Sequence, residues 1–179
     1  MERSQPIRLT RETRKIQRYL RAIEANHYLQ VLEAGESLDQ GRVATLGRQA
    51  NYESEVFTGS GLCRYSSELL KEKLDKKYPK IKTDVVTGRV TPWDNSSQRF
   101  DHFWLRLYLS DGTRMFADAT YGQVRPWINR LVFDFAEHEP EYYGKDIWVE
   151  RCLSISPEQA LKDRFYRKAL ASCRGSGFE

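Results

Sequence analysis

The sequence predicts a single α+β domain over residues 1–179, with helices packed on one side of an antiparallel sheet. Two segments repeat apolar residues every three or four positions, as amphipathic helices do. Three later segments alternate in the manner of half-buried strands. The length of 179 residues and the hydrophobic fraction of 40% are enough for one core.

The first helix is expected from Thr10 to Ala34, with Gly35 as its predicted stop. Cations are concentrated near the front of the chain: Arg8, Arg11, Arg14, Lys15, Arg18 and Arg21. Such a basic N-terminal helix could meet nucleic acid or an acidic partner, but charges on one helix more often form a solvated face. No nucleic-acid motif accompanies them, so we do not expect a nucleic-acid partner.

The elements after this helix follow from local patterns. A second helix is expected from Gly61 or Leu62 to Tyr78, because leucines occupy one side of it and lysines the other. Strands are predicted at 81–90, 101–109, 113–120 and 147–153, and a final helix from Ser156. The apolar segment 124–135 is expected as a helix or an irregular packed segment.

The loop 110–112, Ser-Asp-Gly, suits a three-residue hairpin turn with glycine in the left-handed position. That turn places Leu105 opposite Ala117 and makes their face apolar, so it is the expected core face. Alternation then puts His102 and Asp118 together on the other face, diagonal to each other, with roughly 5 to 7 Å between β-carbons. An imidazole and a carboxylate can bridge that distance.

Cys63 follows Gly-Ser-Gly at 59–61 and falls in the first turn of the second helix. Unpaired amides and the helix dipole favour an anion there, so a thiolate forms more easily. An amide at this helix start is also a candidate oxyanion donor. Cys152 and Cys173 are expected to be structural or incidental free thiols.

The segments GLCRYSSELLKEKL and DHFWLRLYLSDGTRMFADATYGQ resemble the papain-like and transglutaminase-like superfamily of cysteine enzymes, over about the middle third of the chain. The resemblance implies a papain-like/transglutaminase-like core, in which the cysteine helix packs against an antiparallel sheet. It implies that Cys63 is the nucleophile, His102 its base and Asp118 the residue orienting the base. Proteases, transglutaminases, glutamine deamidases and amide-forming acyltransferases share these motifs, so the subfamily stays open.

The expected function is that of a cysteine hydrolase or acyltransferase acting on a peptide or glutamine carboxamide through a thioester. No cofactor is needed. A metal site built on the same three residues would need a further ligand or an open position, and neither His27 nor His138 has a fitting spacing. Two alternatives remain: a non-catalytic binding module, and a nucleic-acid-binding protein that uses the basic helix.

Several other residues are candidates for contacts with a protein, peptide or amide substrate. Trp104 is expected either to line a substrate groove or to cover the sheet, and Trp93 to wall the cleft. Gln123 is either a hydrogen-bonding residue behind the site or a plain turn residue. Gln49 and Asn51 are weak candidates for an oxyanion side chain. The net charge of +4 weakly favours a substrate or partner of acidic character.

No stretch of the sequence approaches the roughly 18 uncharged apolar residues that a membrane span needs. The first residues are polar and basic, without the apolar segment of a secretory signal. We therefore expect no membrane partner and a cytoplasmic protein, with leaderless secretion as the alternative.

Overall fold

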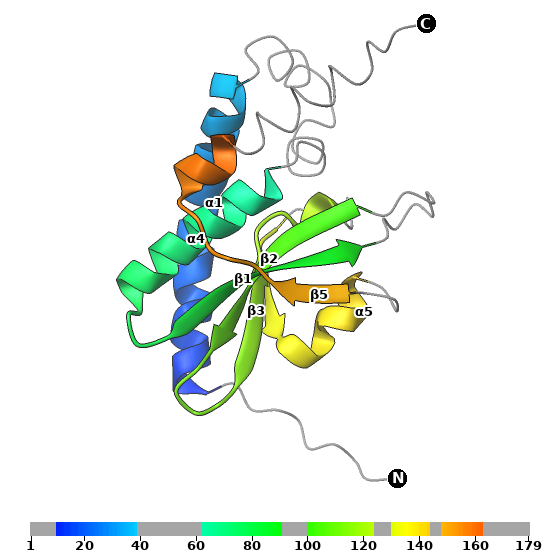
Figure 1. The fold of residues 1–179 in the computed structure, drawn as a ribbon. Coiled ribbons are helices and arrows are strands. Elements are labelled where there is room, and N and C mark those ends of the chain that lie inside the picture. Colours follow the sequence, from blue (N-terminus) through cyan, green and yellow to red (C-terminus); the bar gives the residue numbers. More distant parts are fainter. Residues whose placement is uncertain (1–9, 39–61, 91–99, 124–129, 144–147, 163–179) are drawn as a thin grey trace, which may run out of the picture.

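A five-stranded antiparallel sheet and the helices on it form an α+β fold, as predicted (Figure 1). The computed structural model describes residues 10–38, 62–90, 100–123, 130–143 and 148–162. The strands lie in the order β4-β3-β2-β1-β5. Their bounds are β1 (Lys82–Val90), β2 (Phe100–Tyr108), β3 (Arg114–Asp118), β4 (Val132–Phe135) and β5 (Trp148–Arg151).

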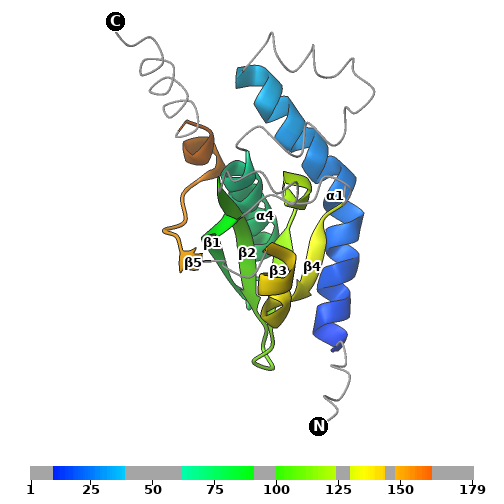
Figure 2. The same ribbon diagram turned by 90° about the vertical axis from the view of Figure 1, so that its right-hand side faces the viewer.

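Helices α1 (Arg11–Leu38) and α4 (Cys63–Lys77) cover one face of this sheet. Figure 2 shows α1 beside the β4 edge, while α4 lies over β1 and β2. The short α5 (Glu139–Tyr143) lies on the opposite face, where Tyr143 packs into a second core with Trp104. The expectation that helices occupy one side only was therefore wrong for α5, because the His102 face of the sheet is apolar enough to need a cover of its own.

The amphipathic pattern of α1 explains its position. Its buried side carries Ile16, Leu20 and Val31, and its predicted start is confirmed by a hydrogen bond of 3.1 Å from the amide of Thr13 to Oγ1 of Thr10. The cations predicted on its other side are exposed where the structure describes them: Arg11, Arg14, Lys15, Arg18 and Arg21. The predicted stop at Gly35 was wrong, since a helix-interior glycine costs only about 1 kcal/mol and α1 continues to Leu38.

Helix α4 begins at Cys63 and ends at Lys77, within two residues of the predicted bounds. Leu70 and Leu74 are buried against the sheet. Oγ of Ser67 donates a hydrogen bond of 3.0 Å to the carbonyl oxygen of Phe103, which ties the first turns of the helix to β2. The start of α4 is thereby held at the end of the sheet where β2 begins.

The β2–β3 hairpin has the predicted register. Leu105 pairs with Ala117, and the same register pairs Leu107 with Met115. Gly112 takes a φ of 84°, the left-handed conformation that the three-residue loop requires. The expected core face and the expected placement of the His102 face are both confirmed.

The largest departure from the predicted elements lies in 124–135. Residues 132–135 form the strand β4, which pairs with β3, so the expected helix or irregular segment was wrong there. Residues 124–129 lie outside the described part of the chain. The last predicted strand is confirmed as β5, which pairs with β1, and a helix is present at 157–162. None of the described helices is both long and apolar enough to cross a membrane.

Candidate active site

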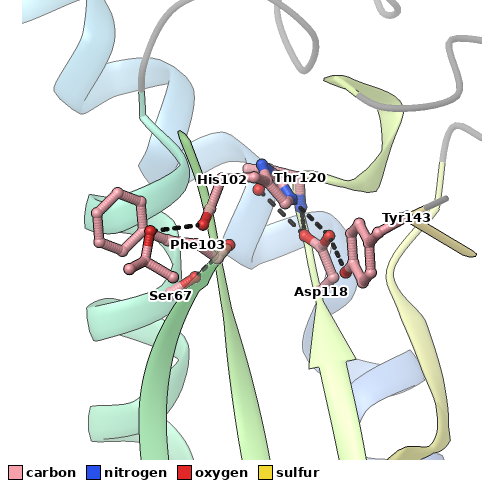
Figure 3. Close-up of polar contacts among 7 residues, drawn as sticks. Ser67, His102, Phe103, Asp118, Thr120 and Tyr143 are labelled. Carbon is pink, nitrogen blue, oxygen red and sulfur yellow. Dashed lines mark hydrogen bonds and ion pairs between the residues drawn. The ribbon is translucent and has the colours of Figure 1, made fainter. Parts of the chain in front are cut away.

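Three elements bring Cys63, His102 and Asp118 toward one end of the sheet. Cys63 is the first residue of α4, His102 lies near the start of β2, and Asp118 is the last residue of β3. The hairpin register places the last two side by side, while the bond from Ser67 to the backbone of Phe103 holds the helix start next to them (Figure 3).

His102 and Asp118 form a buried pair. Nε2 of His102 lies 2.7 Å from Oδ2 of Asp118, and both side chains are completely inaccessible to solvent. The predicted diagonal contact across the hairpin is thus confirmed. With Nε2 bound to the carboxylate, Nδ1 is the ring atom through which a proton can pass to or from a substrate or a thiol.

The carboxylate of Asp118 is held by four hydrogen bonds (Figure 3). Oδ2 also accepts a bond of 2.6 Å from the hydroxyl of Tyr143. Oδ1 accepts bonds from the amide and the hydroxyl of Thr120, at 2.7 and 3.1 Å. A carboxylate with every oxygen engaged in this way is fixed in orientation, and it fixes the imidazole that it binds.

The electrostatics of the pair favour an imidazolium at His102. Burial alone lowers the pKa of His102, but the charge of Asp118 and its hydrogen bond act in the opposite direction. The nearby Cys63 adds to the rise. The net effect raises the pKa of His102 above its usual value, so the ring is protonated at neutral pH.

Cys63 is almost buried, with 5% of its surface exposed. The first helical bond of α4 runs from the amide of Ser66 to the carbonyl of Leu62. The amides of 63–65 precede it and so donate no helical bond within α4, and Leu62 offers no side-chain cap. This is the setting expected for a nucleophilic cysteine and for one oxyanion donor.

Trp104 packs behind the site. Its ring stacks on Tyr143 with centroids 4.4 Å apart, and it lies 5.9 Å from the ring of His102. Trp104 has no exposed surface, so its position favours covering the sheet over lining an open groove. A Cβ atom at Gly88 would lie only 2.5 Å from this ring, so the sequence needs glycine at that point of β1.

The structure brings together some of the predicted site residues and leaves others undescribed. Trp93, Gln49, Asn51 and Cys173 lie outside the described residues, and Gln123 ends the 3-10 helix η1 (Tyr121–Gln123) with its side chain undescribed. Two residues that bind the carboxylate of Asp118, Thr120 and Tyr143, were not predicted from the sequence. Thr120 could have been found, because a threonine two positions after an aspartate commonly bonds back to it. Nothing in the sequence of 139–143 indicates a role for Tyr143.

His27 and His138 are engaged away from the site. Nε2 of His27 lies 2.8 Å from Oγ of Ser66, and Nδ1 of His138 lies 3.2 Å from a carboxylate oxygen of Asp134. Within the described ranges, no group of three or more histidine, cysteine, aspartate or glutamate side chains is arranged to hold a metal ion.

No protein-family model, no curated protein and no solved structure matches this chain. A function can therefore be inferred only from the chemistry of the side chains around His102.

Proposed function

We propose that the protein is a thiol-dependent hydrolase or acyltransferase with a papain-like or transglutaminase-like core. Cys63 attacks a peptide or glutamine carboxamide, His102 moves the proton and Asp118 orients the imidazole. The observation that carries the proposal is the buried Nε2–Oδ2 bond of 2.7 Å in a histidine whose pKa is further raised by a nearby cysteine at a helix start. Such a nucleophile, base and orienter are the parts that acyl transfer requires.

The first half of the reaction forms a thioester. The Cys63 thiolate bonds to the carbonyl carbon, and the π electrons of the C=O bond move to its oxygen, where amides of the α4 start stabilise the charge. When the C–N bond breaks, the His102 imidazolium gives its proton to the leaving nitrogen. The products of this half are an amine or ammonia, a neutral imidazole and the thioester.

The second half regenerates the thiolate. Neutral His102 takes a proton from water or from an acceptor amine, which attacks the thioester carbonyl. The C–S bond breaks, leaving an acid or a new amide, and the thiolate–imidazolium pair is restored. Asp118 stabilises the imidazolium in both halves, and Thr120 and Tyr143 hold that carboxylate in place.

Trapping the thioester tests the proposal directly. The full chain is incubated with glutamine-containing peptides in hydroxylamine, a small amine that converts an acyl-enzyme into a hydroxamate. We expect hydroxamate formation by the wild type and none by Cys63→Ala, with Cys152→Ala as the matched control that keeps activity. Absence of hydroxamate, of peptide cleavage and of a Cys63 adduct across the peptide set would refute the proposal.

One observation supports a second candidate, a binding function of α1. In the described part of the chain, five cations of its first three turns are exposed and none makes an ion pair: Arg11, Arg14, Lys15, Arg18 and Arg21. A nucleic-acid-binding helix would lose affinity steeply with rising salt. Oligonucleotide binding that disappears in Arg14→Glu/Arg18→Glu, in a protein inactive as an acyltransferase, would favour this candidate.

The compartment that fits the proposal is the cytoplasm, because Cys63 and Cys152 are free thiols and thiols stay reduced there.

A further inference from the structure

Three residues on one face of β2 each contact the short helix α5. His102, Trp104 and Arg106 alternate along the strand and therefore point to the same side of the sheet. The ring of Tyr143 stacks on Trp104, with centroids 4.4 Å apart, and lies 5.7 Å from the ring of His102. At the other end of α5, Glu139 binds the guanidinium of Arg106. The helix therefore follows the strand from Arg106 toward His102.

The contact between Arg106 and Glu139 is a bidentate ion pair. Nε of Arg106 donates a hydrogen bond of 2.9 Å to Oε1 of Glu139, and Nη2 donates one of 2.5 Å to Oε2. Glu139 exposes only 2% of its surface, whereas the side chain of Arg106 exposes 30%. A carboxylate buried this deeply needs a charged partner, and a guanidinium fork matches both of its oxygens. Arg106 therefore fixes the place of Glu139 on this face of the sheet.

Helix α5 depends on such contacts for its position. It has five residues, far fewer than the roughly 12 to 15 that an isolated helix needs in water. Glu139 is its first residue and Tyr143 its last. Residues four apart lie on the same side of a helix, so the two side chains that reach the sheet are the ends of one helical turn. A displacement of Glu139 is therefore passed on to Tyr143.

Tyr143 is the point at which α5 reaches the candidate active site. Its hydroxyl donates a hydrogen bond of 2.6 Å to Oδ2 of Asp118, the oxygen that also binds Nε2 of His102 (Figure 3). The stack on Trp104 sets the height of the phenol ring, but offset stacks tolerate sliding of one ring over the other. A bidentate ion pair at the other end of the helix fixes both distance and direction, and so removes that freedom.

Arg106 lies too far along β2 to touch the reacting groups itself. It is four residues from His102, about 13 Å at the rise of a strand. The ion pair carries no net charge, so its direct electrostatic effect on His102 over that distance is small. The contact with α5 is then the route by which Arg106 can act on the site.

We propose that Arg106 and Glu139 are positioning residues of the candidate active site. Their ion pair holds α5 on β2 in the placement from which Tyr143 bonds to Asp118, and so keeps the carboxylate aligned with His102. The effect on turnover rests on the proposed thiol chemistry, whereas the effect on the alignment of His102 does not.

The proton on Nε2 of His102 reports this alignment in the folded protein. It lies in the hydrogen bond to Asp118, so its chemical shift in NMR spectra of the full chain, labelled with ¹⁵N-histidine, depends on the geometry of that bond. A loss of stability alone leaves this shift unchanged, because the signal comes from folded molecules. The measurement therefore separates positioning from a purely structural role.

Two conservative variants weaken the ion pair without leaving a bare charge in the core. Arg106→Lys keeps the cation but loses the fork, and Glu139→Gln removes the buried charge while the partly exposed guanidinium stays hydrated. Both should displace the Nε2 proton resonance in the direction in which Tyr143→Phe displaces it. Glu139→Gln should cause no further displacement in the Tyr143→Phe background, because the bond through which it acts is then absent.

Arg151→Lys is the matched control. It weakens a bond of 3.0 Å from an arginine to the buried carboxylate of Asp84 and should leave the resonance in place. An unshifted resonance in Arg106→Lys or Glu139→Gln, or an equal shift in the control, would overturn the proposal. The same holds if Glu139→Gln acts equally with and without the Tyr143 hydroxyl. If Arg106→Lys does not fold, Glu139→Gln and its combination with Tyr143→Phe decide the matter.

Turnover distinguishes a failure of the proposed function from a failure of the ion pair. In the hydroxamate assay, Arg106→Lys and Glu139→Gln should lower kcat by up to about tenfold, as Tyr143→Phe does, with KM unchanged. A wild type without activity would refute the thiol chemistry and leave the NMR result to decide the ion pair. Wild-type kcat in both variants of an active enzyme would overturn the positioning role.

Discussion

The hydroxyl of Tyr143 donates a hydrogen bond of 2.6 Å to Oδ2 of Asp118, the same oxygen that binds Nε2 of His102. Burial, followed by the charge of Asp118, raises the pKa of Tyr143, so the phenol stays protonated and acts only as a donor. Tyr143 comes from α5, an element distant from the hairpin along the chain. The short helix α5 therefore helps to hold the carboxylate of Asp118 in its orientation.

Replacing Tyr143 by phenylalanine tests this relationship. The variant removes one hydrogen bond to a carboxylate and should lower the free energy of unfolding by about 1.5–3 kcal/mol. Turnover should fall by about tenfold, since a loss near 1.4 kcal/mol in orientation corresponds to that factor. Tyr108→Phe is the control, because Tyr108 is only half-buried on β2 and should change neither quantity. Wild-type stability and turnover in Tyr143→Phe would show that the bond contributes nothing.

Asp118→Asn should leave the fold intact and reduce turnover by about 10²–10⁴-fold, because an amide neither stabilises the imidazolium nor holds the same tautomer. In this variant burial is no longer opposed by a carboxylate, so the pKa of His102 should fall. Circular dichroism checks the fold, and the pH profile of turnover reports the shift. Unchanged turnover on a verified substrate would exclude Asp118 from the mechanism.

The cysteines should differ in reactivity near neutral pH. Cys63 lies at a helix start beside the His102 imidazolium, a setting typical of reactive cysteines. Burial raises the pKa of the Cys152 thiol, which slows its reaction. We expect iodoacetamide to modify Cys63 at least about tenfold faster than Cys152 at pH 6 to 7. The His102→Gln variant should lose most of this difference. Peptide mass spectrometry over time measures both rates, and equal rates in the wild type would contradict a catalytic Cys63.

The parts of the site that were predictable from sequence depend on local rules. A three-residue turn with Gly112 fixes the hairpin register, and alternation then decides that His102 and Asp118 share a face. A helix start at Gly61 or Leu62 followed from the leucine pattern, and α4 begins one or two residues later, at Cys63. Each of these inferences uses contacts between residues close together in the sequence.

The parts that were missed depend on contacts across long stretches of chain. Residues 132–135 have no strand pattern long enough to separate a strand from a buried helix, and only pairing with β3 makes them β4. Tyr143 lies 25 positions from Asp118, and nothing in its own segment indicates a partner. The exposure of Trp148 was also unpredictable, because it depends on how much of the sheet α4 leaves uncovered.

Stability should pass through a maximum near pH 6.5, because two buried histidines are shifted in opposite directions. Burial, followed by the charge of Lys73, lowers the pKa of His27 to about 3. Between this folded-state pKa and the unfolded-state pKa of about 6.5, the unfolded state binds more protons than the folded state, so stability is lost as the pH falls. His102 has a raised pKa, so above about pH 6.5 the folded state binds more protons and stability is lost as the pH rises.

We call the two sides of this maximum the acid limb and the alkaline limb. On each limb the free energy of unfolding should change by up to about 1.4 kcal/mol per pH unit for each histidine. Urea unfolding at intervals from pH 4 to 9 measures both slopes. His27→Gln should flatten the acid limb alone, since a glutamine at the hydrogen bond to Ser66 does not titrate. Asp118→Asn should flatten the alkaline limb, because the carboxylate causes the rise at His102, and should not flatten the acid limb. Variants whose curves run parallel to the wild type over the whole range would show that neither histidine is linked to folding. A variant that flattens the opposite limb would show that the two shifts have been assigned to the wrong residues.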